Sequence, residues 1–188
     1  MVGTIMWVKL ALISLVAVAP LAIAQHPTGC DVKREAPVAF VSEEAQDTLT
    51  VSVVGNPCNE ATVTLRIKDK HNREVYLYEG ILIDHLPFII YEPDLQPLVT
   101  FFAEKVIRDG FIRTTVDLPA WEPVEDYYES TNDIIIVPES EYTDLTRVRK
   151  PIFWHAAGDA TWVHVVYDSA TGYGRIIMRG GVFRPGAQ

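Results

Sequence analysis

The chain has 188 residues, with 25 Asp and Glu against 16 Lys and Arg, so its formal net charge at pH 7 is −9. No stretch of the sequence concentrates basic residues. Proteins that bind nucleic acid or an anionic membrane surface need a basic face, so the composition argues against both partner classes and is compatible with a cationic partner.

The first residues have the pattern of an export signal. Lys9 is followed by an apolar run that ends in Ala22-Ile23-Ala24, the small residues that a signal peptidase requires. We therefore predict a signal peptide over 1–24 and a single exported domain over 25–188, periplasmic or extracellular, with no transmembrane helix in the mature chain. Cleavage would remove one lysine and no acidic residue, which changes the net charge from −9 to −10.

The sequence contains two cysteines, Cys30 and Cys58. Disulfides persist outside the cytoplasm, so we predict that an exported chain joins them. In the chain-entropy model a loop of this size stabilises the fold by roughly 3–4 kcal/mol. The alternative is lipid attachment at Cys30, because Thr28-Gly29-Cys30 partly matches the cleavage site of a lipoprotein.

Three segments in the first half alternate between apolar and polar residues. They are 48–53, 62–68 and 74–83, and short turn sequences separate them. Alternation with period two is typical of strands that bury one face, so we predict a three-stranded antiparallel meander.

The stretch from Asp94 to Gly110 carries a full set of helix signals. Asp94 is a suitable N-cap, Pro97 falls in the first turn, and Gly110 stands where a left-handed C-terminal residue is favoured. Apolar residues recur between them at helical spacing, so one face of this long helix is predicted to be buried.

Elements after this helix are shorter. We predict a strand over 111–116, a long loop over 117–133 and a short strand over 134–137. Ser140 is expected to cap a second, shorter helix that Pro151 stops.

The end of the chain predicts a hairpin, 152–156 with 161–167, followed by a last strand over 174–183. The complete pattern indicates an α+β fold, with an antiparallel sheet of about six to eight strands packed against one long and one shorter helix. If residue 156 pairs with 161, His155 lies opposite Trp162 and His164 opposite Phe153, which places both histidines on one face.

This histidine pair is the sharpest catalytic candidate in the sequence. His155 and His164 could ligate zinc if Asp159 joined them, which would make the protein a metal-dependent hydrolase. No His-Glu-x-x-His motif or cysteine cluster accompanies them, and packed histidines on a strand are far more common. The sequence therefore predicts no cofactor and no assigned catalytic residue.

An acidic-aromatic segment lies within the long loop. No Lys or Arg occurs between Arg113 and Arg147, where nine acidic residues are interspersed with aromatic ones. A negative field with rigid aromatic anchors suits the docking of a cationic protein or peptide, although a solvated loop is the simpler interpretation. The predicted contact residues are Trp121, Glu122, Glu125, Asp126, Tyr127, Tyr128 and Glu129. The prediction is a non-catalytic binding or inhibitor-like module, with a structural envelope component as a further alternative.

Two segments, Leu118-Pro119-Ala120-Trp121 and Tyr142 to Tyr167 with its Lys150-Pro151-Ile152-Phe153, resemble exported bacterial proteins that remain uncharacterised. Members of that group tend to carry cysteines near the positions of Trp154 and His164, which this chain lacks. The resemblance implies that these positions are structural, and it implies no activity.

Overall fold

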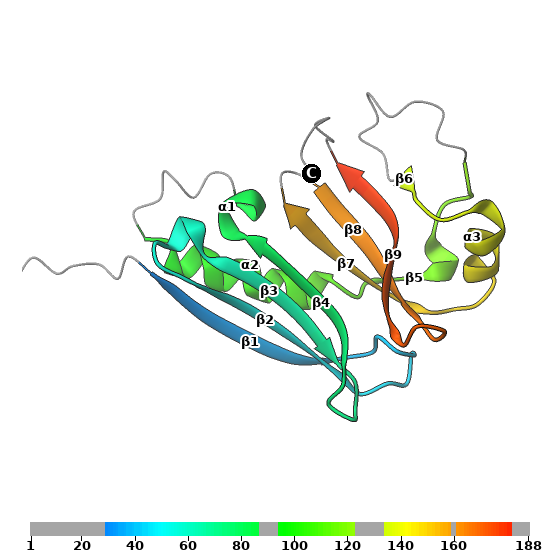
Figure 1. Ribbon diagram of the computed structural model, residues 1–188, viewed down its shortest axis with the longest axis horizontal. Coiled ribbons are helices and arrows are strands. Elements are labelled where there is room, and N and C mark those ends of the chain that lie inside the picture. The colour runs from blue at the N-terminus through cyan, green and yellow to red at the C-terminus, as the bar shows by residue number, and fades with distance from the viewer. Residues whose placement is uncertain (1–28, 87–93, 123–133, 159–160, 182–188) are drawn as a thin grey trace, which may run out of the picture.

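The computed structural model describes residues 29–86, 94–122, 134–158 and 161–181. Within these residues the chain forms two antiparallel β-sheets and three α-helices, which confirms the predicted α+β class (Figure 1). The strands divide between two sheets, whereas the sequence analysis placed them in one.

The first sheet contains, in spatial order, β1 (Cys30–Val38), β2 (Asp47–Gly55), β3 (Thr62–Lys68) and β4 (Glu74–Ile81). The second contains, in spatial order, β5 (Arg113–Thr114), β7 (Pro151–Gly158), β8 (Thr161–Asp168), β9 (Tyr173–Gly181) and β6 (Ile134–Ile135). The helices are α1 (Leu82–His85), α2 (Gln96–Asp109) and α3 (Glu139–Thr146).

The first sheet is a meander in which each strand pairs with the next along the chain. β2, β3 and β4 correspond to the three predicted strands, and the alternating apolar residues of β2 and β3, from Leu49 to Val53 and from Val63 to Ile67, are buried on one face. β1 was not predicted, because its inner side carries Arg34 and the alternation of apolar and polar residues is incomplete. Arg34 instead forms an ion pair with Glu104 of α2, with 3.6 Å between Nε and Oε1.

The second sheet has two very short edge strands, β5 and β6. Both are shorter than predicted: after Thr114 the chain turns into a 3-10 helix over Thr115–Asp117, in which Thr114 and Asp117 cap each other. Short edges limit pairing with strands of other molecules.

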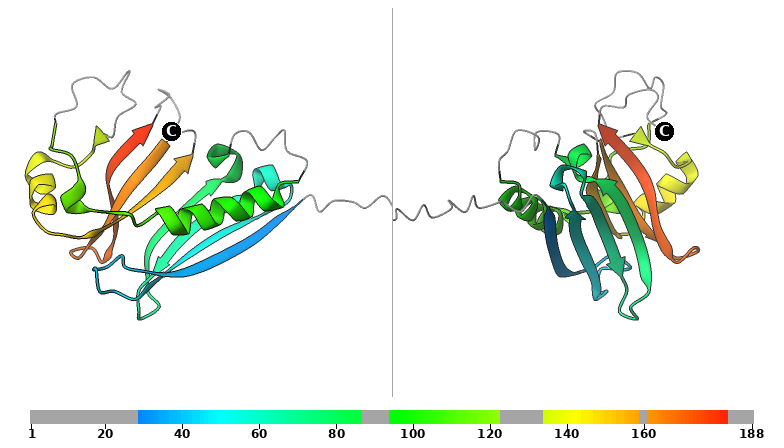
Figure 2. Two further views of the ribbon diagram at one scale, coloured as in Figure 1. Left: turned by 180° about the vertical axis from the view of Figure 1, so that it is seen from behind. Right: turned by 60° about the vertical axis from the view of Figure 1, so that its left-hand side comes forward.

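Helix α2 lies over the buried face of β1 and β2 (Figure 2). The N-cap is Leu95, so the predicted cap at Asp94 is wrong by one residue; Asp94 accepts a hydrogen bond from the backbone N–H of Gln96 at 3.2 Å. Pro97 lies in the first turn as predicted.

The predicted left-handed conformation of Gly110 is wrong, because this residue has φ −68° and ψ −21°. A side chain at Gly110 would instead meet the carbonyl oxygen of Val106 and the ring of Phe153, since a Cβ there would lie 2.6 Å from that oxygen and 2.8 Å from Cε2 of the ring.

Helix α3 covers the face of the second sheet that points away from the first sheet (Figures 1 and 2). It begins after Pro138 and ends at Thr146, so the predicted cap at Ser140 and the predicted end at Pro151 are both wrong. The helix stops early because the following residues pair with the end of β5. Thr115 donates its backbone N–H to the carbonyl of Lys150 at 2.9 Å, and Lys150 donates its own N–H to Thr115 Oγ1 at 3.0 Å.

The buried side chains form two clusters. The larger one fills the space between the two sheets and α2, with contributions that include Leu65 of β3, Phe102 of α2 and Phe153 of β7. The smaller one lies between α3 and the outer face of the second sheet and is centred on Tyr142, Ile152 and Ile177. The second sheet is therefore buried on both faces over part of its area.

Cys30 and Cys58 form the predicted disulfide bond. This bond uses the sulfur atom that lipid attachment would need, so the lipidated alternative is wrong for this structure. No helix in the described part of the chain is long and apolar enough to cross a membrane. The predicted signal peptide, 1–24, lies outside the described residues.

Candidate functional site

The predicted contact segment starts next to the smaller core cluster, between α3 and the second sheet. Trp121 is partly buried and packs with Leu118 against the core cluster beneath α3, and Glu122 beside it is exposed. The remaining predicted contact residues lie outside the described residues; they are Glu125, Asp126, Tyr127, Tyr128 and Glu129.

Some carboxylates of the acidic stretch are neutralised by arginines. Glu141 forms a two-point ion pair with Arg175 of β9, and the Nη2–Oε2 distance is 3.0 Å. Asp144 pairs with Arg147 at 3.1 Å, with both side chains largely exposed, so this pair adds little stability.

Other acidic residues of the same stretch have different environments. Asp117 accepts hydrogen bonds from the backbone N–H and the hydroxyl of Thr114, at 2.9 and 2.7 Å, and these bonds hold the pKa of its carboxyl below the usual range. Among the described residues no hydrogen bond or ion pair is found for the carboxylates of Glu122 and Glu139. In the described part of the acidic stretch, unneutralised carboxylates are therefore found at the start of the predicted contact segment, through Glu122, and at the start of α3, through Glu139.

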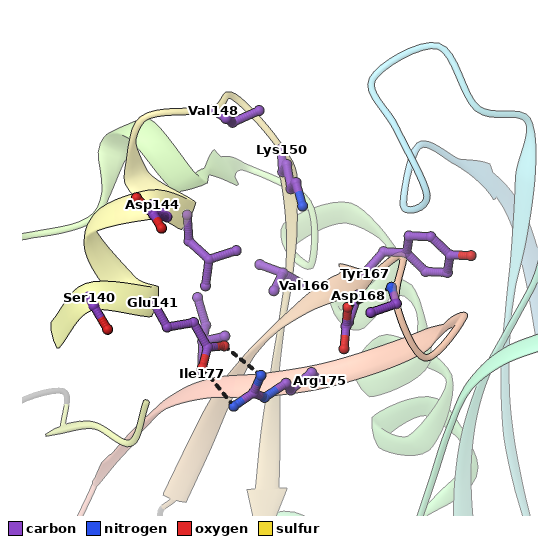
Figure 3. A pocket seen from close by; sticks show the side chains of 12 residues that line it. Ser140, Glu141, Asp144, Val148, Lys150, Val166, Tyr167, Asp168, Arg175 and Ile177 are labelled. Carbon is purple, nitrogen blue, oxygen red and sulfur yellow. Dashed lines mark hydrogen bonds and ion pairs between the residues drawn. The ribbon is translucent and has the colours of Figure 1, made fainter. Parts of the chain in front are cut away.

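A cavity of about 550 Å³ lies between α3 and strands β8 and β9 (Figure 3). Its apolar walls are formed by Leu145, Val148, Val166 and Ile177. Val148 is 54% exposed. The volume falls within the range of roughly 300–1,000 Å³ that small-molecule pockets occupy.

Charged groups surround these apolar walls. Asp144, Asp168 and the Glu141–Arg175 pair lie around the rim, and the ammonium group of Lys150 points toward the cavity (Figure 3). The carboxylate of Asp168 is fixed in place by the backbone N–H of Ala170 at 2.8 Å. This hydrogen bond is the main cause that lowers the pKa of the Asp168 carboxyl.

The predicted pairing of the C-terminal hairpin is wrong by one residue. His155 lies opposite Val163 and His164 lies opposite Trp154, because a β-bulge between Ala156 and Gly158 shifts the register. A shift of one residue turns a side chain to the other face of the sheet. The two histidines therefore project from opposite faces of the sheet and cannot ligate one metal ion together.

His155 belongs to a buried group of aromatic rings between the sheets. It is 1% exposed, and its Nε2 lies 2.6 Å from the hydroxyl of Tyr76, while Nδ1 lies 2.6 Å from the carbonyl oxygen of Ala156. A carbonyl only accepts, so Nδ1 carries the proton and Nε2 of the neutral ring accepts from Tyr76. Burial lowers the pKa of His155 to about 4 and raises that of Tyr76.

A second histidine joins the same group. The Nε2 of His85 lies 3.1 Å from the hydroxyl of Tyr78, and the ring centroid of Tyr78 is 4.8 Å from that of His155. Burial lowers the pKa of His85 to about 4, and the nearby charge of Asp84 opposes this shift. Burial also raises the pKa of Tyr78 to about 12.

This arrangement is that of packed core histidines. Both ring nitrogens of His155 are engaged, and its ring is closed off from solvent. Within the part of the chain that the structure describes, no group of three or more His, Cys, Asp and Glu side chains could hold a metal ion. Asp159, the third ligand of the predicted zinc site, lies outside the described residues.

Comparisons with known proteins give no match: no family model, no curated protein and no solved structure resembles the chain significantly. The resemblance to exported bacterial proteins therefore stays a prediction.

The aromatic group and the cavity were both missed by the sequence analysis. The ring of His155 meets Tyr76, which is 79 residues away in the sequence, and no local pattern reports such a contact. One sequence signal was available for the first sheet: the adjacent apolar residues Val75 and Tyr76 interrupt the alternation of β4. In the structure both are buried, at an irregularity in the pairing of β3 with β4.

Proposed function

We propose that the protein is an exported, non-catalytic binding module that contacts a cationic protein or peptide through its acidic-aromatic segment, residues 121–129. One observation carries the proposal. Residues 114–146 contain nine Asp and Glu and no Lys or Arg, and both flanks of the segment rest on one core, through Trp121 on one side and Tyr142 on the other. A negative field held next to a rigid surface attracts and orients a cationic partner.

Export is supported by the disulfide bond. Cys30 and Cys58 are joined, and such bonds persist in compartments outside the cytoplasm. The pattern of residues 1–24 provides the corresponding signal.

The absence of a role for His155 in chemistry is supported by its environment. A general base must reach the proton that it removes, and a buried ring with both nitrogens in hydrogen bonds has no position for a substrate. The geometry of this histidine therefore favours a binding module over a hydrolase.

The experiment compares two neutralised variants. In the first, the four acidic residues of the segment, Glu122, Glu125, Asp126 and Glu129, become Gln or Asn. In the matched control, four exposed carboxylates elsewhere become amides; they are Asp31, Glu44, Glu60 and Glu79. Both variants carry the same net charge, so only the location of the charge differs.

The measurement is the affinity of each protein for a lysine-rich peptide at low and at moderate salt, with the acetylated peptide as a blank. We expect binding by the wild type that weakens as salt screens the charges, strong loss in the segment variant, and little loss in the control. Equal loss in the two variants would show that only net charge matters and would refute a defined contact segment.

A further inference from the structure

Helix α1 lies at the end of β4, next to β7 and to the 3-10 helix over Cys58–Glu60 (Figure 1). Two backbone hydrogen bonds hold it: Leu82 donates its N–H to the carbonyl of Ala61 at 2.8 Å, and Leu86 donates to the carbonyl of Leu82 at 3.0 Å. Of the four residues of α1 only Leu82 is fully buried. A helix this short is not stable by itself in water, so its place depends on the contacts that its side chains make.

The ring of His85, the last residue of α1, is fitted tightly against the core. Its Nε2 lies 3.1 Å from the hydroxyl of Tyr78, and its centroid lies 5.5 Å from that of Phe102 on α2. A Cβ at Gly80 would lie 2.6 Å from the Tyr78 hydroxyl oxygen and 2.9 Å from Nε2, so this contact leaves no room for a further atom. Among the described residues, no hydrogen-bond partner is found for the buried Nδ1.

This environment suits a neutral imidazole ring and not a charged one. The neutral ring carries one proton on its two nitrogens, whereas the charged ring carries a proton on both. In the charged ring, Nδ1–H of His85 would be a buried donor without an acceptor, whichever nitrogen carried the first proton. Water would supply that acceptor, so the charged ring is favoured only when it is outside the core.

The titratable groups around His85 do not compensate for this loss. The residues that face it or belong to the elements packed against it are Asp84 of α1, Tyr78 of β4, His155 of β7, Phe102 of α2 and the exposed Glu60 of the 3-10 helix. Asp84 favours a charged ring at His85, and burial outweighs it. His155 acts in the opposite sense, because two charged imidazoles would repel each other.

From this geometry we infer that α1 is an acid-released latch: protonation of His85 frees α1 from Tyr78 and β7 while the two sheets stay folded. Release uncovers the faces of the Tyr78 and Phe102 rings that His85 covers. His155 responds differently, because it lies within β7 and both of its nitrogens are engaged, so its protonation requires the sheets to separate. Local release of α1 therefore takes up one proton on an imidazole, and global unfolding takes up two.

Amide hydrogen exchange of the disulfide-bonded protein at pH 7 and pH 5 tests the latch, and it needs no partner. The reporter is the N–H of Leu86, whose bond to Leu82 breaks when α1 is released, and the reference is the slowest-exchanging amides of β2 and β3. Rates are corrected for the intrinsic effect of pH on exchange. With a pKa of about 4 for His85 in place and 6.5 when free, opening of α1 should increase about 20-fold from pH 7 to pH 5. Global unfolding releases both histidines, so opening of the core should increase by roughly 400-fold.

Two variants identify the group that titrates. His85→Gln removes the buried ring, and His71→Gln is the matched control on the exposed turn between β3 and β4. We expect the protection of Leu86 to become independent of pH in the first variant and to keep its wild-type dependence in the second.

Three outcomes would each overturn the latch. They are equal losses of protection at Leu86 and in the core, unchanged protection of Leu86 between pH 7 and pH 5, and a wild-type pH dependence in the His85 variant. If that variant does not fold, the comparison of Leu86 with the core in the wild type still decides between local release and global unfolding.

Discussion

Two neutral imidazole rings in the core make the stability of this protein sensitive to acid. His85 and His155 each have a pKa near 4 because burial disfavours the charged ring. The groups that face them are Tyr76 and Tyr78 of β4 and Asp84 of α1, with aromatic rings on the remaining sides. Asp84 favours a charged ring at His85 and the carbonyl of Ala156 does so at His155, but burial outweighs both and lowers the pKa of each ring, so protonation in the folded state is resisted.

The sign of the pH effect follows from these values. The ordinary pKa of histidine, 6.5, applies to the unfolded chain, so between pH 6.5 and about 4 the unfolded state binds more protons than the folded state. The free energy of unfolding should therefore fall as the pH is lowered through this window. A shift of this size corresponds to at most about 3 kcal/mol for each histidine.

Replacing one of the two histidines should reduce this sensitivity. We expect His85→Gln to flatten the dependence of the urea midpoint on pH between 6.5 and 4, because the variant has one fewer group to protonate on unfolding. His71→Gln serves as the control, since His71 is exposed on the turn between β3 and β4. A His85 variant with the same pH slope as the wild type would contradict the buried, neutral assignment.

The joint between α2 and β7 decides how the helix is set against the second sheet. The carbonyl of Gly110 accepts a hydrogen bond from the N–H of Trp154 at 2.7 Å. Phe153, the preceding residue of β7, stacks on Phe111 with 4.9 Å between ring centroids. The backbone of the helix end and that of the strand are thus in direct contact, which requires a residue without a side chain at position 110.

We therefore expect Gly110→Ala to lower the free energy of unfolding by about 1–3 kcal/mol, through overpacking against the carbonyl oxygen of Val106 and the ring of Phe153. This result would run against local preference, because alanine is favoured over glycine at a right-handed helical residue. The measurement is urea unfolding of the variant and the wild type.

Gly172 provides a contrast for this substitution. It has φ +74°, and the nearest atom to a Cβ there is the Tyr167 hydroxyl oxygen at 3.9 Å, so conformation and not space limits this position. Asparagine tolerates the left-handed region, so Gly172→Asn should be mild whereas Gly110→Asn should be severe. Equal effects at both sites would remove the close-contact explanation.

At the scale of the whole molecule, the first sheet is closed at one end by a covalent bond. Cys30 begins β1, and Cys58 lies in the 3-10 helix between β2 and β3, 28 residues further along the chain. Reduction of the wild type should lower the free energy of unfolding by about 3–4 kcal/mol. The Cys30→Ala, Cys58→Ala variant should unfold at the same urea concentration with and without reductant. A wild type that is insensitive to reductant would contradict a stabilising role for the bond.

The sequence predicted those parts of the fold that depend on local pattern. The alternation in β2 and β3 and the apolar spacing of α2 both indicate one buried face, and the disulfide was predicted from two cysteines in a chain that carries an export-like signal. The strand β1 was not predicted, because Arg34 faces inward and pairs with Glu104 of α2, which interrupts the apolar pattern. The division into two sheets depends on contacts between distant segments, which no local window contains.

The candidate site was predicted less well for a related reason. A single β-bulge near Ala156 places His155 and His164 on opposite faces of the sheet, and bulges leave no clear mark in the sequence. The cavity is formed by α3 with residues of β8 and β9, so its lining could be assembled only after the second sheet was known. The acidic composition of the region was visible from the start, and it remains the basis of the proposed function.

The place where β1 begins determines how the molecule is best attached to a sensor surface. β1 begins at one end of the long axis, and α3 lies near the other (Figure 1). A tag placed upstream of residue 29 would hold the protein on a sensor by the end remote from the cavity. Coupling through amines has no such preference for one end, and Lys150 lines the cavity. Binding studies with immobilised protein should therefore use the first geometry, which leaves the acidic end free in solution.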